Sequence, residues 1–485
     1  MTIKALLNQG VDRARRRDYV GAIAIFNRVI EQDPGYEKAY YNRACAYCDL
    51  GRYEPAIDDF TLAIHFNPNY LHAYINRGNA QRHLGNYEAA RDDFDRGVAI
   101  APDEAKSYGS RGLLLLDLDE YDGAIRDFDQ ALALQPDFPK AYLWRGFAWL
   151  RSDEPQLAVT DLTHALTYDD ECPEAYNNRG LAHFYLGEYD LSLVDFDRAI
   201  ALDSDFPEAY NNRANVRAEL GDEAGALADY RRALSLQPDL NQVYYNRAVL
   251  AQALGDLRSA VSDYDHSLSL SSDNSDAFNN RGNVRAVMGD REGAVKDYSE
   301  AIRLDPDRAN SYNNRGLIRL YACNYRRAFD DFDQAIQLNP EHAAAYSNRG
   351  TARHHLHDYD GAIADFDQAI QLNPFLSEAY ARRGQSKATL SDDAGALDDF
   401  SRALMLNPTD AVTYSNRGRL RFHICDRDGA LDDINKALDL NPDLSDAYIN
   451  RSIVRFGSGD KLGAIKDLDY AMEAQRKHQR ALKTA

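Results

Sequence analysis

Two consecutive stretches of equal length decide the fold. Residues 173–206 read PEAYNNRGLAHFYLGEYDLSLVDFDRAIALDSDF, and residues 207–240 read PEAYNNRANVRAELGDEAGALADYRRALSLQPDL. Both begin with PEAYNNR, and both place small, aromatic and charged residues at corresponding points. A repeat period of 34 predicts a solenoid of repeated units instead of a single globular core.

The period extends along the whole chain. Pro34, Pro68 and Pro102 are separated by one period each, and later prolines recur at multiples of that spacing. Fourteen repeats fill residues 1–476, with a boundary at every period (1–34, 35–68 and so on to 443–476). The remaining residues 477–485 read KHQRALKTA, a basic tail that we expect to extend the last helix or to be disordered.

Each repeat carries the pattern of two closely packed helices. We count positions from the third residue of a repeat, so that Glu37 is position 1 of repeat 2. Position 8 is small (Gly78) and position 24 is bulky (Phe94), which predicts large side chains facing small ones across a helix pair. A glycine or polar break near positions 15 and 16 (Gly51) separates the helices, and the proline region ends the second.

These residues resemble the tetratricopeptide repeat. The small positions 8, 20 and 27, the aromatic positions 4 and 24, and the closing proline match that family over residues 1–476. The resemblance implies an all-α fold, a right-handed α-solenoid superhelix of tandem helix-turn-helix units. It also implies that the first helices line a concave groove, with positions 2, 5, 6, 9, 12 and 13 facing the bound partner.

An arginine and an aspartate recur together in repeats 2 to 14. Position 7 is Arg and position 23 is Asp in all thirteen, whereas repeat 1 has Gln9 and Ile25. Pairing within a repeat leaves no residue without a partner, so we predict thirteen structural salt bridges. An arginine ladder for anionic ligands is the alternative. Representative pairs are Arg43 with Asp59, Arg213 with Asp229, and Arg349 with Asp365.

Position 6 carries a ladder of asparagines. An amide both donates and accepts hydrogen bonds, so a row of amides can hold the backbone of an extended peptide regardless of its side chains. The ladder resembles the one that lines the superhelix of O-linked N-acetylglucosamine transferases, although no glycosyltransferase domain follows in this sequence. The alternative is that these asparagines cap or brace neighbouring helices. Besides Asn8, the ladder comprises Asn42, Asn76, Asn178, Asn212, Asn246, Asn280, Asn314, Asn348, Asn416 and Asn450.

The ladder is interrupted in repeats 4 and 5. Ser110 and Trp144 stand at position 6 there, and Phe147, Phe184 and Tyr185 occupy nearby groove positions. Aromatic residues on a concave surface are typical anchors for a partner, so we include these three and Trp144 in the predicted groove. The alternative is that the solenoid or a neighbouring loop covers them.

Position 2 changes the sign of its charge along the chain. It is Lys in repeats 4 and 5 (Lys106, Lys140) and Glu in repeats 6 and 7 (Glu174, Glu208). Such a polarity can orient an extended ligand with its acidic part toward the N-terminal repeats. Plain solubility is the alternative interpretation.

Composition excludes several classes of partner and chemistry. The chain carries a net charge of −21, which disfavours nucleic acid as a partner. Five cysteines are few and scattered, which favours a cytoplasmic protein, and the C-x-x-C of Cys45 and Cys48 is weak support for a metal or redox site. No apolar run is long enough to insert into a membrane. We expect neither a cofactor nor a metal.

The sequence therefore predicts a non-catalytic scaffold or adaptor that binds extended peptide segments of other proteins in its groove. A helical-repeat RNA-binding protein is the second interpretation, disfavoured by the negative charge. An enzyme is the third, since no catalytic motif is present. We expect a monomer or a weak dimer.

Overall fold

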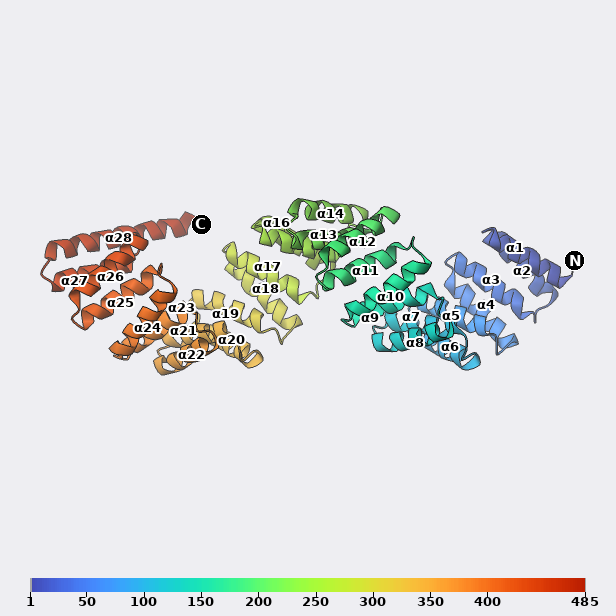
Figure 1. Ribbon diagram of the computed structural model, residues 1–485, viewed down its shortest axis with the longest axis horizontal. Coiled ribbons are helices and arrows are strands. Elements are labelled where there is room, and N and C mark those ends of the chain that lie inside the picture. The colour runs from blue at the N-terminus through green and yellow to red at the C-terminus, as the bar shows by residue number, and fades with distance from the viewer. Residues whose placement is uncertain (1, 485) are drawn as a thin grey trace. The chain divides into compact units, whose positions relative to one another are not determined.

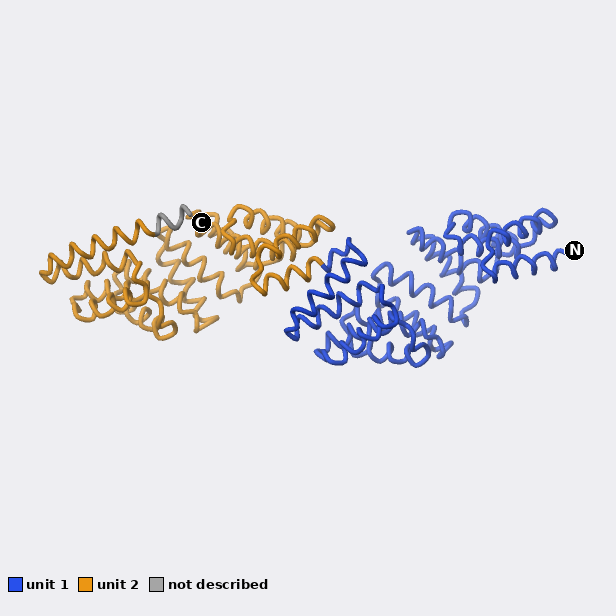
Figure 2. Tube along the Cα trace, turned by 90° about the horizontal axis from the view of Figure 1, so that it is seen from above, with its two compact units in different colours: residues 1–243 blue, residues 244–485 orange. Residues whose placement is uncertain are grey.

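The computed structural model describes residues 2–484, with side chains as far as residue 477, and contains twenty-eight α-helices and no strand in that range (Figure 1). The predicted all-α solenoid of tandem helix pairs is confirmed. The chain divides into two compact units, residues 1–243 and residues 244–485, which we describe separately (Figure 2).

Helices alternate between a first and a second helix of each repeat. The N-terminal unit contains α1 (Ile3–Arg15), α2 (Tyr19–Gln32), α3 (Glu37–Asp49), α4 (Tyr53–Phe66), α5 (Leu71–His83), α6 (Tyr87–Ile100), α7 (Ala105–Asp117), α8 (Tyr121–Leu134), α9 (Pro139–Arg151), α10 (Pro155–Tyr168), α11 (Pro173–Tyr185), α12 (Tyr189–Leu202), α13 (Pro207–Glu219) and α14 (Glu223–Leu236). After α15 (Asn241–Ala253) come α16 (Leu257–Leu270), α17 (Ser275–Val287), α18 (Arg291–Leu304), α19 (Ala309–Tyr321), α20 (Tyr325–Leu338), α21 (Ala343–His355), α22 (Tyr359–Leu372), α23 (Ser377–Thr389), α24 (Asp393–Leu406), α25 (Ala411–His423), α26 (Arg427–Leu440), α27 (Ser445–Gly457) and α28 (Lys461–Thr484).

A left-handed residue ends the first helix of every repeat. Position 15 has φ between +57° and +91° throughout, and glycine occupies it in seven repeats. Glycine adopts this conformation without strain, whereas other residues do so at a cost of about 1 kcal/mol. The turn then leads into the second helix, where Asp222 caps α14 by accepting a hydrogen bond from the Gly225 N–H at 3.0 Å.

The core of each repeat is the predicted contact of a large side chain with a small one. Phe94 on α6 is fully buried, and a Cβ added to Gly78 on α5 would lie 2.7 Å from its ring. No side chain fits at Gly78 without moving the aromatic ring. The helix pair is thereby held at close range, which fixes the first helices that carry the candidate site.

Candidate functional site

Contacts between first helices define an inner face in each compact unit. In the N-terminal unit these contacts run from α1 with α3 to α11 with α13, and in the C-terminal unit from α17 with α19 to α25 with α27. Within either unit, no two second helices contact one another in the part of the chain that the structure describes. The first helices are therefore closer together than the second helices, and we call their shared exposed surface the inner face.

Asparagines of the ladder link consecutive first helices. The amide nitrogen of Asn76 donates to the Tyr41 hydroxyl at 3.0 Å, and that of Asn212 donates to the Asn177 side chain at 3.0 Å. The acceptor is at position 5 of the preceding repeat in both cases. Three further members follow the same rule: Asn280 donates to Tyr245 at 3.2 Å, Asn348 to Asn313 at 2.9 Å and Asn450 to Ser415 at 2.9 Å.

These hydrogen bonds correspond to the alternative interpretation of the ladder, in which its asparagines brace neighbouring helices. The acceptors at position 5 include side chains that are almost fully buried, with Asn177 7% and Ser415 2% exposed, so these side chains do not line the inner face as expected. Position 6 itself is half-buried in repeats 2 to 14. An asparagine amide has two N–H donors, so a single bracing bond leaves one available to a ligand.

Ladder members behave differently where position 5 of the preceding repeat cannot accept a hydrogen bond. For Asn42 the position 5 residue of the preceding repeat is Leu7, and Asn42 instead donates to the carbonyl of Lys38 in its own helix at 2.6 Å. For Asn178 the position 5 residue of the preceding repeat is Leu143. Its amide nitrogen donates to no residue within 2–477, and its amide oxygen accepts a hydrogen bond from Asn177 at 3.3 Å.

The other members lie at the same helical position and are half-buried. Asn314 donates to Asn283 on α17 at 3.1 Å, while the Asn279 oxygen at position 5 accepts a hydrogen bond from Ser311. Asn246 lies on α15 and Asn416 on α25. For Asn416 the position 5 residue of the preceding repeat is Ala381, which has no side-chain acceptor.

The interrupted part of the ladder is aromatic in the structure. Trp144 on α9 packs against Phe128 and Phe138, with ring centroids 5.9 Å and 6.2 Å apart, so the solenoid itself covers part of it. Gly109, at position 5 of the preceding repeat, leaves room: a Cβ there would lie 3.1 Å from Phe138 and 4.0 Å from Trp144. An indole over a glycine thus replaces the amide bond found at other steps.

Neighbouring aromatic residues are more accessible. Phe147 on α9 is 38% exposed and Tyr185 on α11 is 60% exposed, whereas Phe184 is half-buried and its ring lies 5.8 Å from that of Tyr185. Exposed aromatic side chains on the inner face can provide apolar contact area for a partner.

A pocket of about 450 Å³ opens beside Trp144. Its apolar lining includes Leu143 and Trp144 on α9. Charged residues stand on both sides, Lys140 on α9 and Glu174 on α11. The remaining lining residues are Pro139, Ala165, Asp169, Glu171, Cys172 and Pro173.

The arginine at position 7 and the aspartate at position 23 of the same repeat form a close ion pair in repeats 2 to 14. The distances range from 2.5 Å to 2.8 Å, and the aspartate side chains are at most 10% exposed. Representative distances are 2.6 Å for Arg43 with Asp59, 2.7 Å for Arg213 with Asp229, and 2.6 Å for Arg349 with Asp365.

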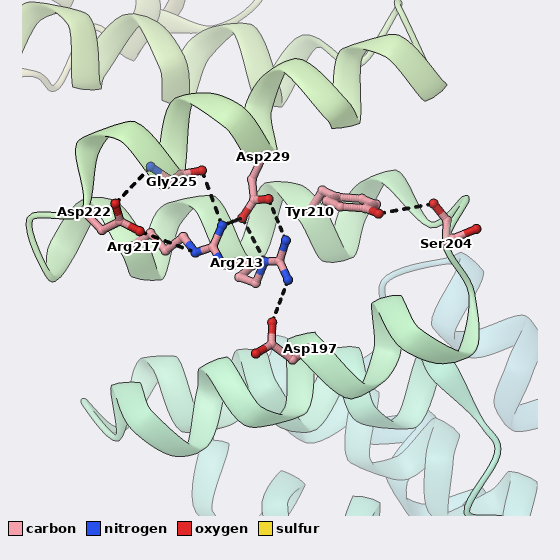
Figure 3. A network of polar contacts seen from close by, with 8 residues as sticks. All are labelled: Asp197, Ser204, Tyr210, Arg213, Arg217, Asp222, Gly225 and Asp229. Atoms are coloured by element: carbon pink, nitrogen blue, oxygen red, sulfur yellow. Dashed lines mark hydrogen bonds and ion pairs between the residues drawn. The ribbon is translucent and has the colours of Figure 1, made fainter.

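In all of these repeats except repeat 8, the guanidinium also donates to a side chain at position 25 of the preceding repeat, a partner that the sequence pattern does not reveal. Figure 3 shows repeat 7, where Arg213 donates through Nε and Nη2 to Asp229 and through Nη1 to Asp197 of the preceding repeat at 2.6 Å. The guanidinium also lies 5.5 Å from the ring centre of Tyr210. The Asp229 carboxylate raises the pKa of Arg213 above its ordinary value. We call this arrangement of a position 7 arginine and its carboxylate partners a clamp; it braces two repeats and leaves little capacity for an anionic ligand.

A second cation reaches the buried aspartate in the later repeats. Arg217, at position 11, donates to Asp229 at 2.7 Å and also lies 3.7 Å from Asp222 (Figure 3). In repeat 2, position 11 is Tyr47, so Asp59 has Arg43 alone. The number of cations at one aspartate therefore differs between repeats.

The cysteines do not form a site. All five are free, and burial raises the pKa of Cys45 to about 11 and that of Cys48 to about 12, so both thiols stay protonated near neutral pH. Over residues 2–477 no cluster of three histidine, cysteine or acidic side chains is placed to hold a metal ion. Nor does any helix that the structure describes have the length and apolar character needed to cross a membrane.

Sequence profiles described as tetratricopeptide repeat or TPR repeat match nine segments that together cover well over half of the chain. The matched segments are residues 4–36, 37–70, 72–104, 112–152, 173–206, 207–240, 242–274, 288–320 and 343–376. A search of curated proteins finds no match.

Solved structures that are similar to this chain include the Cut9–Hcn1 heterotetramer of the APC/C, with 15% identity, a TM-score of 0.49, and coverage of 97% of this chain and 96% of that chain. A tetratricopeptide repeat protein from Parabacteroides merdae has 18% identity and a TM-score of 0.44, covering 51% of this chain and 98% of its own. YrrB, described as a TPR protein with an unusual peptide-binding site, has 23% identity and a TM-score of 0.33, covering 39% and 97%.

Proteins built from this repeat typically mediate protein–protein interactions and are generally non-catalytic. The repeat period, the helix pairs and the profile matches agree along the chain. The chain belongs to the tetratricopeptide repeat family.

Proposed function

We propose that this protein is a non-catalytic scaffold or adaptor whose inner face binds extended peptide segments of partner proteins. The observation that carries the proposal is the combination, on the first helices, of exposed aromatic side chains with half-buried amides. Phe147 and Tyr185 offer apolar area, and a ladder amide with a single bracing bond, such as that of Asn212, keeps one N–H for a ligand.

The clamps also support the proposal. They join consecutive repeats, so the inner face is held in one arrangement before a partner binds. A preorganised surface spends less of its interaction free energy on ordering side chains, which favours tight binding of a flexible segment.

Charge supports a protein partner over nucleic acid. A net charge of −21 repels phosphate backbones, so the RNA-binding alternative has no favourable electrostatic term. We place the protein in a reducing compartment such as the cytoplasm because its five thiols are all free. The proposal treats the protein as a monomer or a weak dimer, which light scattering measures directly.

A peptide library displayed on phage and selected on the full chain tests the proposal. Selected peptides are then titrated by fluorescence anisotropy against the wild type, an inner-face variant (Phe147→Ala with Tyr185→Ala) and an outer-face control (Leu191→Ala with Val194→Ala). The control residues are 52% and 64% exposed on α12, so their loss should not disturb folding.

We expect the inner-face variant to bind at least about tenfold more weakly, because exposed aromatic anchors dominate such contacts. The control should bind like the wild type. If the outer-face variant loses binding instead, or if both variants bind normally, the inner face is not the binding surface.

A further inference from the structure

We propose that the step between repeats 5 and 6 is a specificity site for a peptide segment that carries one large apolar side chain between acidic and basic residues. The apolar side chain enters the pocket beside Trp144. Acidic residues of the segment lie toward Lys140, and basic residues lie toward Glu174. This inference rests on the proposed function and names the chemistry of the partner at one place on the inner face.

Local sequence makes the contact between repeats 5 and 6 unlike the contact between repeats 6 and 7. Repeat 5 has Leu143 at position 5 and Trp144 at position 6. Leu143 cannot accept a hydrogen bond from Asn178, so no amide bond links α9 and α11. The pocket of about 450 Å³ lies there, and Leu143 and Trp144 contribute large apolar side chains to its lining. That volume accommodates one large apolar side chain together with part of its neighbours.

Charge around the pocket is arranged with opposite signs on its two sides. Lys140 is on α9, while Asp169, Glu171 and Glu174 are at the end of α10 and the start of α11. Among the described side chains, none of these four forms an ion pair. Asp169 accepts only the Glu171 backbone N–H, and Glu174 accepts the Cys172 thiol. Their charges are therefore available to a ligand.

The same polarity continues along position 2 on both sides of the pocket. Lys106 on α7 and Glu208 on α13 are exposed and make no ion pair with any described residue. Consecutive first helices lie roughly 10 Å apart, which an extended peptide spans in about three residues. A segment with an acidic part, one apolar residue and a basic part therefore matches repeats 4 to 7 in order.

Asn178 supplies the backbone contact. It lies one helical turn after Glu174 on the same face of α11, and its amide nitrogen has no acceptor among the described residues. At the next step, Asn212 already donates to Asn177. Asn178 can thus donate to a peptide carbonyl, and Asn212 is a matched control at the same position of the following repeat.

The test uses the full chain and two synthetic peptides labelled with fluorescein. One has an acidic block, a central phenylalanine and a basic block; the other has the same composition with its charges alternating. We expect the wild type to bind the block peptide several-fold more tightly. Trp144→Ala should weaken binding by about tenfold or more, as expected for an aromatic anchor, and Asn178→Ala should weaken it more than Asn212→Ala.

Charge reversal provides the decisive arm. Lys140→Glu should weaken binding of the block peptide several-fold and strengthen binding of a peptide with basic blocks on both sides. Neither Lys140 nor Trp149, the second tryptophan, belongs to a clamp. In a Trp149→Phe background, Trp144 is the single tryptophan, so its fluorescence reports occupancy of the pocket. Circular dichroism checks that this variant is folded.

Equal binding of the two peptides by the wild type, no measurable binding of either, or an unchanged preference in Lys140→Glu would overturn the inference. Two patterns separate it from the proposed function. If Trp144→Ala binds normally while Phe147→Ala with Tyr185→Ala does not, the inner face binds peptides but the pocket does not select them. If all these variants bind normally, both proposals fail.

Discussion

Replacing Asp229 with asparagine should remove most of the stability that the clamp of repeat 7 provides. The carboxylate accepts three hydrogen bonds, from Arg213 Nε at 2.8 Å, Arg213 Nη2 at 2.7 Å and Arg217 Nη1 at 2.7 Å, and its side chain is 5% exposed (Figure 3). The substituted amide would keep one acceptor oxygen but would point its NH₂ group at a guanidinium donor. Breaking a buried ion pair on one side costs about 3–5 kcal/mol.

Asp197→Asn is the matched control because it changes another carboxylate on the same Arg213. Asp197 lies 2.6 Å from Nη1, but its side chain is 61% exposed. Exposed pairs contribute about 0.2–1 kcal/mol. The two substitutions should therefore differ by about 3 kcal/mol, which is about a 100-fold difference in the equilibrium constant for local opening.

Hydrogen exchange of α13 and α14 measures that constant, since repeats of a solenoid open locally. Urea denaturation gives the global stability without the ionic screening that guanidinium adds. Asp59→Asn adds a graded comparison: Asp59 has one cation where Asp229 has two, so its loss should destabilise less. If Asp229→Asn proves as mild as Asp197→Asn, the clamp does not stabilise the repeat.

Local geometry gives three further predictions. Ser391→Gly should stabilise the protein by about 1 kcal/mol in urea denaturation, because Ser391 holds φ at +62° where other repeats have glycine; an unchanged midpoint would contradict this. Iodoacetamide at pH 8 should alkylate the exposed Cys323 well before Cys45, whose pKa burial raises to about 11, and peptide mass spectrometry would detect the reverse order. Burial lowers the pKa of His354 from its ordinary 6.5 to about 4, so NMR titration should find its imidazole neutral at pH 5. Between these two pKa values the unfolded chain takes up a proton at His354 that the folded state does not. The free energy of unfolding is therefore unaffected by His354 above about pH 6.5 and decreases as the pH falls toward 4.

Much of the fold and one set of contacts could be predicted from the residues alone. The period of 34, the small residue at position 8 and the bulky one at position 24 are local patterns, and each recurs in step with the helices. The pairing of Arg213 with Asp229 inside one repeat follows from repeat 1, which lacks both the arginine at position 7 and the aspartate at position 23. A repeated pattern shows which positions change together, even though the sequence contains no interatomic distances.

Other contacts depend on how one repeat lies against the next. No periodic signal distinguishes the partner of Arg213 Nη1. Position 25 is aspartate in some repeats, asparagine, serine or threonine in others, and arginine in repeat 7. The asparagine ladder is regular in sequence, but whether the amide nitrogen of Asn178 or Asn212 makes a bracing bond depends on the residue 35 positions earlier.

The sequence by itself determined the helix pairs, their number and the ion pair inside each repeat, because these depend on spacing along one chain segment. Only the tertiary structure decided which side chains lie between repeats and which remain accessible. Trp144 illustrates the difference, because its place in the ladder is evident from the sequence but its surroundings are not. Its packing on Phe128 forms only when α9 lies against α8, and the pocket beside it forms only when α11 follows. Accessibility is a property of neighbouring surfaces, and those surfaces form when the repeats stack.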